Sequence, residues 1–442
     1  MREALQRCAP TLEALWPRLQ QLTDWERAER SRMRVDLEPE RDLLARLGQP
    51  QRRFKSVHVG GTKGKGSVCA LIEAGLLAAG LRTGRYASPH IEHVTERVNL
   101  NGQPVSEPVL AEALRHALSA RDAAAAAASP GRHASWFDVV TAAAFWAFAR
   151  AGIEWAVVEV GLGGLLDSTN VLQPELCVLT NVELEHTEIL GRSVEAIAAQ
   201  KAGIVKHGCP IVTPMSPSSP AGRVVAEAAA ACGADHRWID LAPTPGVHAR
   251  NRLLACAALA RLGELGVTSA VRGLPLRAED LSIGLAATTQ LPGRLEPFDL
   301  VTARDGKTRV LLDGAHVAFS IDAVFEELRL DPVYAGQAVV LLALAPDKDA
   351  RAFIERLAPH AARLICTQLP DAKPCRSAAE LARIARQAGL QAEAVDSPTE
   401  AFNAALSRLA EGEWLLATGS LHLAGGLRSL LRNGAVAKPR GD

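Results

Sequence analysis

Hydrophobic positions along the chain follow two alternating patterns, one typical of strands and one typical of helices. A β-type run over residues 54–59 leads into a glycine-rich turn. After the turn, apolar residues recur at helical spacing, namely Val68, Leu71, Ile72, Leu76 and Ala79. Strands are also predicted over residues 155–160, 176–182 and 210–212, with helices over 137–150, 195–204 and 251–265. This alternation predicts a mostly parallel sheet with right-handed crossovers.

Other segments of the first 290 residues add helices, a hairpin and loops. Leucines at helical spacing predict helices over residues 12–22, 43–47 and 107–120. The charged stretch 25–34 predicts a solvated helix or loop, and the alanine-rich stretch 123–131 predicts a loop. Asn101-Gly102 between two short apolar runs indicates a hairpin.

A second alternating series begins after residues 291–295. Its strands are predicted over residues 308–312, 338–345, 363–367 and 414–418, with helices between them. We therefore expect residues 1–290 to form one α/β domain and residues 296–442 a smaller, doubly wound, Rossmann-like domain. Residues 291–295, which include Pro292 and Gly293, are the predicted linker and hinge.

Composition narrows the function classes. The 442 residues contain 49 Lys and Arg against 49 Asp and Glu, so no charge excess favours a nucleic acid or a membrane surface as partner. No apolar run has the length of a membrane span, and the first residues lack a signal-peptide pattern. The eight cysteines form no Cys-x-x-Cys pair, which indicates thiols in a reducing cytosol. We therefore expect a cytoplasmic protein.

The glycine-rich turn at residues 61–67 has the chemistry of a phosphate cradle. Glycines let backbone N–H groups converge on a phosphate, and the following helix adds the positive end of its dipole. Lys65 would reach the terminal phosphates. Gly66 stands where Ser or Thr usually follows such a lysine, and the hydroxyl comes one position later, at Ser67.

Four further residues near predicted strand ends are candidates for chemistry, and each also has an ordinary structural explanation. Glu159 ends an apolar strand, where a buried carboxylate is costly unless it is paired or bound to a metal. His186 could simply face solvent, Ser88 could be a turn residue and Lys201 a surface lysine. The carboxyl ends of parallel strands meet at one edge of a sheet, which favours a shared site.

Taken together and in order, ten short motifs resemble the folylpolyglutamate synthase/dihydrofolate synthase family of Mur-type ATP-dependent ligases. The resemblance covers residues 37–431. The motifs are Gly61-Thr-Lys-Gly-Lys-Gly-Ser67, Ser88-Pro-His90, Glu96-Arg97, Glu159-Val-Gly-Leu-Gly-Gly164, Asp167-Ser-Thr-Asn170, His186-Thr, Gln200-Lys-Ala-Gly-Ile204, Pro292-Gly-Arg294, Asp313-Gly-Ala-His316 and Thr418-Gly-Ser420.

The resemblance implies an ATP-dependent ligase that adds L-glutamate to a folate through an acyl phosphate, and it leaves open whether dihydropteroate is a second acceptor. It implies two Mg²⁺ sites with Ser88, Glu159, His186 and a carbamylated Lys201 as ligands, and catalytic roles for Lys65, Lys201 and His186. It implies ATP contacts from Gly61, Thr62, Gly64, Lys65, Gly66, Ser67, Asn251, Arg294, Asp313 and His316. A monomer with small-molecule substrates, without nucleic acid or membrane partners, is expected.

Four residues depart from the family pattern: Lys63, Leu165, Glu185 and Val317. None of them removes a phosphate or metal ligand, but they leave the substrate preference open. The alternatives are another Mur-type amide ligase with a different acid acceptor, and a catalytically inactive nucleotide-binding paralogue. The retained Lys65, Glu159, His186 and Lys201 argue against the inactive paralogue.

Overall fold

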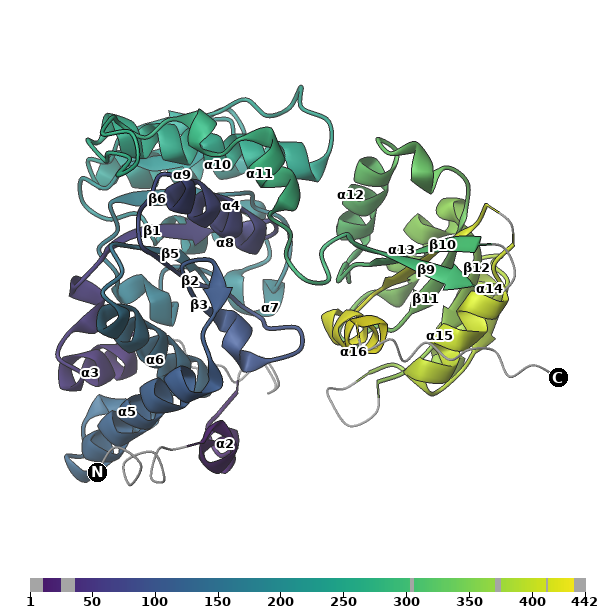
Figure 1. Ribbon diagram of the computed structural model, residues 1–442, viewed down its shortest axis with the longest axis horizontal. Helices are drawn as coiled ribbons and strands as arrows, with labels where there is room; N and C mark the ends of the chain where they lie inside the picture. The colour runs from purple at the N-terminus through teal and green to yellow at the C-terminus, as the bar shows by residue number, and fades with distance from the viewer. Residues whose placement is uncertain (1–10, 25–35, 303–305, 370–374, 411, 433–442) are drawn as a thin grey trace. The chain divides into compact units, whose positions relative to one another are not determined.

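A computed structural model describes residues 11–24, 36–302, 306–369, 375–410 and 412–432 (Figure 1). The charged stretch 25–34, predicted to be a solvated helix or loop, lies outside the described residues. The chain separates into two compact units. The first contains Met1–Pro243 and Arg250–Thr289, and the second contains Thr244–Ala249 and Gln290–Asp442.

The first unit is built on an eight-stranded sheet with the order β4-β3-β2-β5-β1-β6-β7-β8. In this order, each strand from β2 to β8 pairs in parallel with the next. Strand β3 is antiparallel to β2, and β4 is antiparallel to β3. The strands are β1 (Lys55–Gly60), β2 (Thr83–Tyr86), β3 (Val98–Leu100), β4 (Gln103–Pro104), β5 (Trp155–Glu159), β6 (Leu176–Leu179), β7 (Ile211–Thr213) and β8 (His236–Trp238).

Helices cover both faces of this sheet (Figure 1). They are α2 (Leu12–Gln20), α3 (Glu38–Arg46), α4 (Lys65–Ala78), α5 (Glu107–Ala126), α6 (Trp136–Ala151), α7 (Thr187–Leu190), α8 (Val194–Ala202), α9 (Pro220–Ala231), α10 (Val247–Glu264) and α11 (Ile283–Thr288). Side chains of alternate β5 residues point to opposite faces of the sheet. Ala156 and Val158 pack in the core with α5 and α6, and Val157 packs in the core with α4 and α10.

Helix α5 extends through part of the alanine-rich stretch, so the predicted loop over residues 123–131 is wrong in two places. The helix continues to Ala126, and a 3₁₀ turn spans Pro130–His133. Alanine is the strongest helix former, and Ala124 is fully buried in this helix. The polar residues that follow are held by Asp42, whose carboxylate accepts from the Gly131 amide at 2.8 Å.

The second unit is built on a six-stranded sheet with the order β13-β12-β11-β14-β10-β9. Its strands are β9 (Glu296–Thr302), β10 (Gly306–Leu312), β11 (Ala338–Leu342), β12 (Ala361–Cys366), β13 (Ala392–Ala394) and β14 (Trp414–Thr418). Only β9, at one edge, is antiparallel to its neighbour. The sequence patterns predicted neither β9 nor β13.

Five helices cover this second sheet, which makes the unit doubly wound. They are α12 (Ala318–Leu328), α13 (Ala350–Leu357), α14 (Ala378–Gln387), α15 (Pro398–Ser407) and α16 (Leu421–Arg432). Val340 and Leu342 of β11 pack with α12, α13 and α14, whereas Val339 and Leu341 pack with α15 and α16. Residues 291–295, the predicted hinge, group with this unit.

A buried ion pair stabilises the first unit beside its central sheet. Glu73 of α4 accepts from Arg85 Nε of β2 at 2.7 Å, from the Thr83 hydroxyl at 3.2 Å and from the Gly102 amide at 3.3 Å. Only 4% of the Glu73 side chain and 10% of the Arg85 side chain are exposed. The carboxylate therefore joins a helix, a strand and the turn of the β3–β4 hairpin.

The substitution Glu73→Ala is expected to lower the free energy of unfolding by about 3–5 kcal/mol, because it leaves the Arg85 guanidinium buried without its counter-ion. Urea unfolding followed by circular dichroism measures this loss. The matched control is Glu154→Ala, which removes a carboxylate from an exposed pair with Arg82 and should cost about 1 kcal/mol or less. Equal losses in the two variants would contradict the role given to Glu73.

Candidate active site

The phosphate loop lies between β1 and α4, as the sequence pattern predicted. Gly61 and Gly64 have φ angles of +142° and +80°, which side-chain-bearing residues rarely adopt. Gly64 is the residue before α4, so the loop turns directly into the helix N-terminus. Lys65 is the first helical residue, and its Nζ donates to the Thr62 carbonyl at 3.3 Å. The backbone N–H groups of the loop and the positive end of the helix dipole therefore lie together at the N-terminus of α4, where a phosphate would be stabilised.

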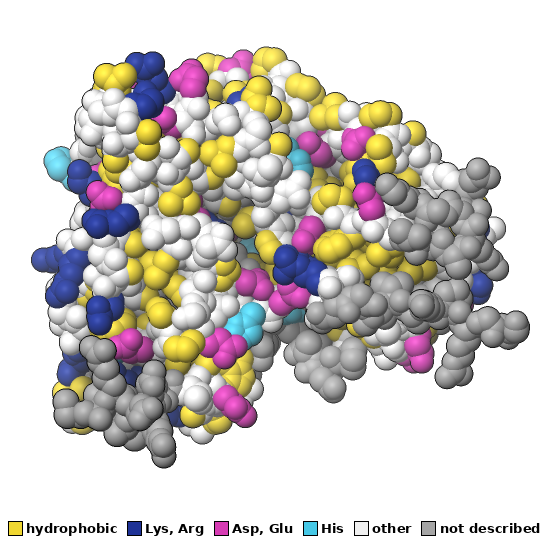
Figure 2. Space-filling view, viewed as in Figure 1, with side chains coloured by type: hydrophobic (Ala, Val, Ile, Leu, Met, Phe, Trp, Pro, Cys, Tyr) yellow, Lys and Arg dark blue, Asp and Glu magenta, His cyan; other side chains and the backbone are white. Residues whose placement is uncertain are grey.

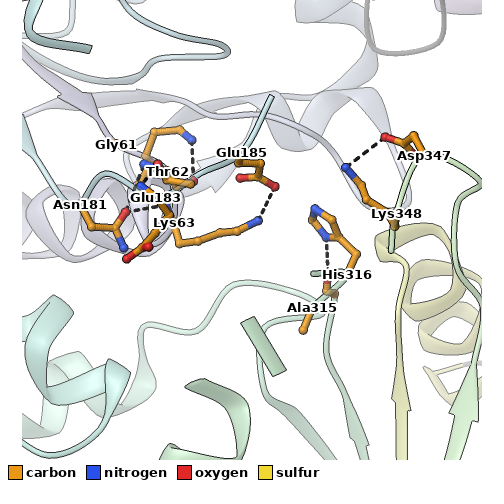
Figure 3. A network of polar contacts seen from close by, with 12 residues as sticks. Gly61, Thr62, Lys63, Asn181, Glu183, Glu185, Ala315, His316, Asp347 and Lys348 are labelled. Carbon is orange, nitrogen blue, oxygen red and sulfur yellow. Dashed lines mark hydrogen bonds and ion pairs between the residues drawn. The ribbon is translucent and has the colours of Figure 1, made fainter. Parts of the chain in front are cut away.

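The segment after β6 holds this loop in shape. Asn181 Oδ1 accepts from the backbone amides of Thr62 at 3.1 Å and Lys63 at 2.8 Å (Figure 3). The Glu183 amide donates to the Thr62 hydroxyl at 3.0 Å, and the Thr180 hydroxyl donates to the Lys63 carbonyl at 2.6 Å. We missed these three residues in the sequence, although they follow a predicted strand that neighbours β1.

Two of the four departures from the family pattern contact each other. Lys63 Nζ lies 2.8 Å from Glu185 Oε1, and only 7% of the Glu185 side chain is exposed (Figure 3). Glu185 therefore has a cationic partner in the loop. The pair connects the phosphate loop to the residue that immediately precedes His186.

Asn251 lies directly against the phosphate loop. A Cβ atom placed on Gly64 would come within 2.8 Å of Asn251 Oδ1. Asn251 belongs to α10, far along the chain from the loop. Its amide group is thus placed beside the helix N-terminus where the sequence resemblance expects a nucleotide.

Ser88 and Glu159 come together at the carboxyl ends of neighbouring strands. Glu159, the last residue of β5, is 5% exposed, and its Oε2 accepts from the Ser88 amide at 3.1 Å. Ser88 follows β2, which pairs in parallel with β5. The hydroxyl and carboxylate supply hard oxygen donors, the kind that Mg²⁺ prefers.

Asp167 shapes the glycine turn that follows Glu159. Its Oδ2 accepts from the Leu162 amide at 2.8 Å, and its Oδ1 accepts from the Thr169 amide at 3.0 Å. Burial raises the pKa of this carboxyl group, and the hydrogen bonds from Thr169 and Leu162 oppose that rise. Asp167 is therefore a positioning residue for the segment behind Glu159.

Lys201 is buried beside the phosphate loop. It lies near the end of α8, it is 5% exposed, and its Nζ donates to the Gly61 carbonyl at 2.7 Å. Burial, followed by the charge of Lys65, lowers the pKa of Lys201 to about 7. Lys201 is therefore not a surface lysine, as its ordinary structural explanation would have it.

His186 is the residue before the short helix α7, with a left-handed φ of +55°. This backbone conformation is uncommon for a residue other than glycine, and such residues gather at functional sites. Among the described residues, no cluster of three or more His, Cys, Asp and Glu side chains is arranged to hold a metal ion. A metal site here would therefore need the Ser88 hydroxyl or a modified Lys201 in addition to Glu159 and His186.

In the second unit, Arg294, Asp313 and His316 gather around Gly314, at the carboxyl end of β10. A Cβ atom placed on Gly314 would come within 2.7 Å of Arg294 Nη1, and His316 Nδ1 lies 2.8 Å from the Gly314 carbonyl oxygen. Asp313 is 6% exposed and accepts from the amides of Leu295 at 3.0 Å and Ala315 at 2.7 Å. Its carboxylate thus also shapes the loop.

Residues 293–421 match the family described as Mur ligase, glutamate ligase domain. The folylpolyglutamate synthase of Lacticaseibacillus casei is 29% identical over 432 residues, which is 89% of this chain and 93% of that protein.

Solved structures agree with the sequence comparison. Escherichia coli FolC in complex with DHPP and ADP is 25% identical, with a TM-score of 0.80 over 97% of this chain and 99% of that one. The bifunctional folylpolyglutamate synthase/dihydrofolate synthase of Yersinia pestis, complexed with AMPPNP and a Mn ion, is 27% identical. Its TM-score is 0.77 over 96% of this chain and 98% of that one.

The C-terminal part of the chain therefore matches a domain of the Mur ligases, and its two-domain α/β fold matches that of these solved structures. Within that class, the resemblance to the folylpolyglutamate synthase/dihydrofolate synthase family, which the ten motifs predicted, is confirmed.

Figure 2 shows acidic and basic side chains dispersed among hydrophobic ones on the visible face, in keeping with the equal numbers of positive and negative residues. Within the described ranges, no helix is both long enough and apolar enough to span a membrane.

Proposed function

We propose that this protein is an ATP-dependent ligase that joins L-glutamate to the carboxyl group of a folate. The observation that carries the proposal is the occurrence in one chain of a phosphate loop backed by Lys65 and a domain matching the glutamate ligase domain of Mur ligases. Dihydropteroate is proposed as a second acceptor, because the similar Yersinia pestis protein is named for both activities.

The reaction needs activation of a poor electrophile. A carboxylate resists attack by an amine, so the acceptor carboxylate first attacks the γ-phosphorus of ATP, which gives an acyl phosphate and ADP. The α-amino group of glutamate then attacks the acyl carbon, loses a proton, and phosphate leaves. The Lys65 ammonium and the N–H groups at the start of α4 would stabilise negative charge on the transferred phosphoryl group.

The other predicted ATP contacts extend this arrangement. Asn251 would approach the phosphates beside Gly64, while Gly61, Thr62, Gly66 and Ser67 would complete the loop around them. The second unit would contribute Arg294, Asp313 and His316 to the nucleotide. Residues 291–295 are proposed as a hinge whose role would be to help exclude water, which otherwise hydrolyses the acyl phosphate.

Divalent metal ions belong to the proposal as well. Ser88, Glu159 and His186 would hold one Mg²⁺, and a carbamate on Lys201 would supply an anionic oxygen ligand for a second. Bound Mg²⁺ would neutralise phosphate charge and orient the reacting oxygens. The buried Ser88–Glu159 contact supports the first set, because its donors are hard oxygens. An unmodified, protonated Lys201 would repel a cation, so its burial beside the loop favours the modification. The protein is proposed to act as a cytoplasmic monomer.

Phosphate release tests the function directly. The protein is incubated with ATP, Mg²⁺, glutamate and either tetrahydrofolate or dihydropteroate, and free phosphate and the ligated product are measured. We expect glutamate-dependent release with tetrahydrofolate, and release with dihydropteroate if both activities are present. ATP binding without turnover of either acceptor would indicate the inactive paralogue, and turnover of a different acid alone would indicate another Mur-type ligase. Either result would overturn the proposal.

A further inference from the structure

A cavity lies in the first unit, away from the phosphate loop. Its volume is about 580 Å³, within the range of small-molecule sites. Its lining includes Phe54, which directly precedes β1, and Glu175, which directly precedes β6. The phosphate loop follows the other end of β1. The cavity therefore lies at the amino-terminal edge of the parallel strands, opposite the edge that carries the candidate active site.

Positive charge dominates the lining of this cavity. Arg41, Arg52 and Lys206 come from three separate segments, and they face one carboxylate, Glu175. That carboxylate already accepts from the Ser56 amide at 2.6 Å. Arg41 pairs with Glu38 at 2.7 Å, whereas neither Arg52 nor Lys206 forms an ion pair with any residue in the described part of the chain.

Lys206 is the most enclosed of the three cations. Its Nζ donates to the Asn170 carbonyl at 3.0 Å. Burial lowers the pKa of Lys206, and the nearby positive charge of Arg41 adds to that effect. Two cations held close together in this way repel each other, and an anion placed between them would relieve the repulsion.

Unpaired amide oxygens accompany the cations. Asn170 is 4% exposed, and its side-chain nitrogen donates to the Leu165 and Gly203 carbonyls, at 2.8 Å and 3.1 Å. Its Oδ1 has no hydrogen-bond donor among the described residues, and the same is true of Gln51 Oε1. Buried acceptors without a donor are costly, so a ligand or its bound water that donates here would be stabilised.

We propose that this cavity is a second binding site, distinct from the phosphate loop, for a small organic anion with two or more carboxylate or phosphate groups. Arg41, Arg52 and Lys206 would bind the anionic groups. Phe54 would pack against the carbon skeleton, and the amide side chains would accept from hydroxyl or amine groups of the ligand. The volume suits a metabolite rather than a peptide segment or a nucleic acid.

Isothermal titration of the whole protein with citrate and with pyrophosphate tests this site and separates carboxylate from phosphate ligands. Saturating ADP is present in both titrations to occupy the phosphate loop. We expect one binding event with at least one of the two probes. Arg52→Gln removes an exposed cation and leaves a polar side chain, and it should weaken that event by about tenfold or more. Lys206→Gln should weaken it as well.

Arg53→Gln is the matched control, because Arg53 is the exposed neighbour of Arg52 and does not line the cavity. It should leave the affinity unchanged. Binding of citrate alone would identify a carboxylate site, and binding of pyrophosphate alone a phosphate site. The proposal is overturned if neither probe binds with ADP present, or if Arg52→Gln and Arg53→Gln bind equally well. If Lys206→Gln does not fold, the comparison of Arg52→Gln with Arg53→Gln still tests the proposal.

Discussion

Lys65→Ala is expected to lower kcat of the proposed ligase by about 100- to 1,000-fold, the usual loss when one preorganised charge-stabilising group is removed. Lys65 begins α4, where its ammonium and the helix N-terminus face the same loop. ADP lacks the γ-phosphate that Lys65 would contact. ADP affinity should therefore change by less than about tenfold, which separates lost transition-state stabilisation from lost nucleotide binding. Steady-state kinetics and ADP titration measure both quantities.

Lys63→Ala is the matched control for this prediction. It removes the same charge from the same loop, but the Lys63 ammonium already lies 2.8 Å from Glu185. We expect a smaller loss of kcat from Lys63→Ala than from Lys65→Ala. A loss as great for Lys63→Ala, or unchanged kcat for Lys65→Ala, would contradict the role proposed for Lys65. Thermal unfolding of both variants checks that the fold is retained.

Much of the fold follows from local pattern. Buried strands such as β5 and β11 are continuous apolar runs, and a helix covers each face, so period and length identify them. Strands β9 and β13 lie at the two edges of the second sheet, where one flank is unpaired and polar residues are tolerated. Their patterns are correspondingly weak. The alanine-rich end of α5 was missed because low complexity resembles a loop, although alanine favours the helix.

The site was predicted less completely, because contacts between distant segments leave no local signal. The glycine spacing predicts the loop, and the order of the strands brings Ser88 beside Glu159. Nothing in the sequence shows that Asn181 holds the amides of Thr62 and Lys63, over 100 residues away. That contact depends on the register of β1 with β6. The burial of Lys201 likewise depends on how α8 packs behind the loop, which composition does not reveal.

Lys201→Ala is expected to reduce ligase activity by about 100-fold or more, because it would remove a metal-binding carbamate from the site. The carbamate forms when the neutral amine adds to the carbon of CO₂ and releases one proton, so no further reactant is needed. The alanine variant leaves a cavity beside the Gly61 carbonyl, where Nζ now donates at 2.7 Å. A small free carboxylate such as formate or acetate should enter it and partly restore activity.

Lys201→Arg is the control that separates a carbamate from a simple positive charge. Arginine keeps the charge and fills the space, but its guanidinium remains protonated and does not add CO₂. We expect this variant to be inactive and not to be rescued by formate or acetate. NMR of the unsubstituted protein in isotopically labelled bicarbonate should show a carbamate signal that is absent from both variants. Full activity of Lys201→Arg, or a plain lysine in the active enzyme with metal bound, would contradict the modification. Because Lys201 packs against the phosphate loop, the same experiment tests whether the loop and the metal ligands act as one site.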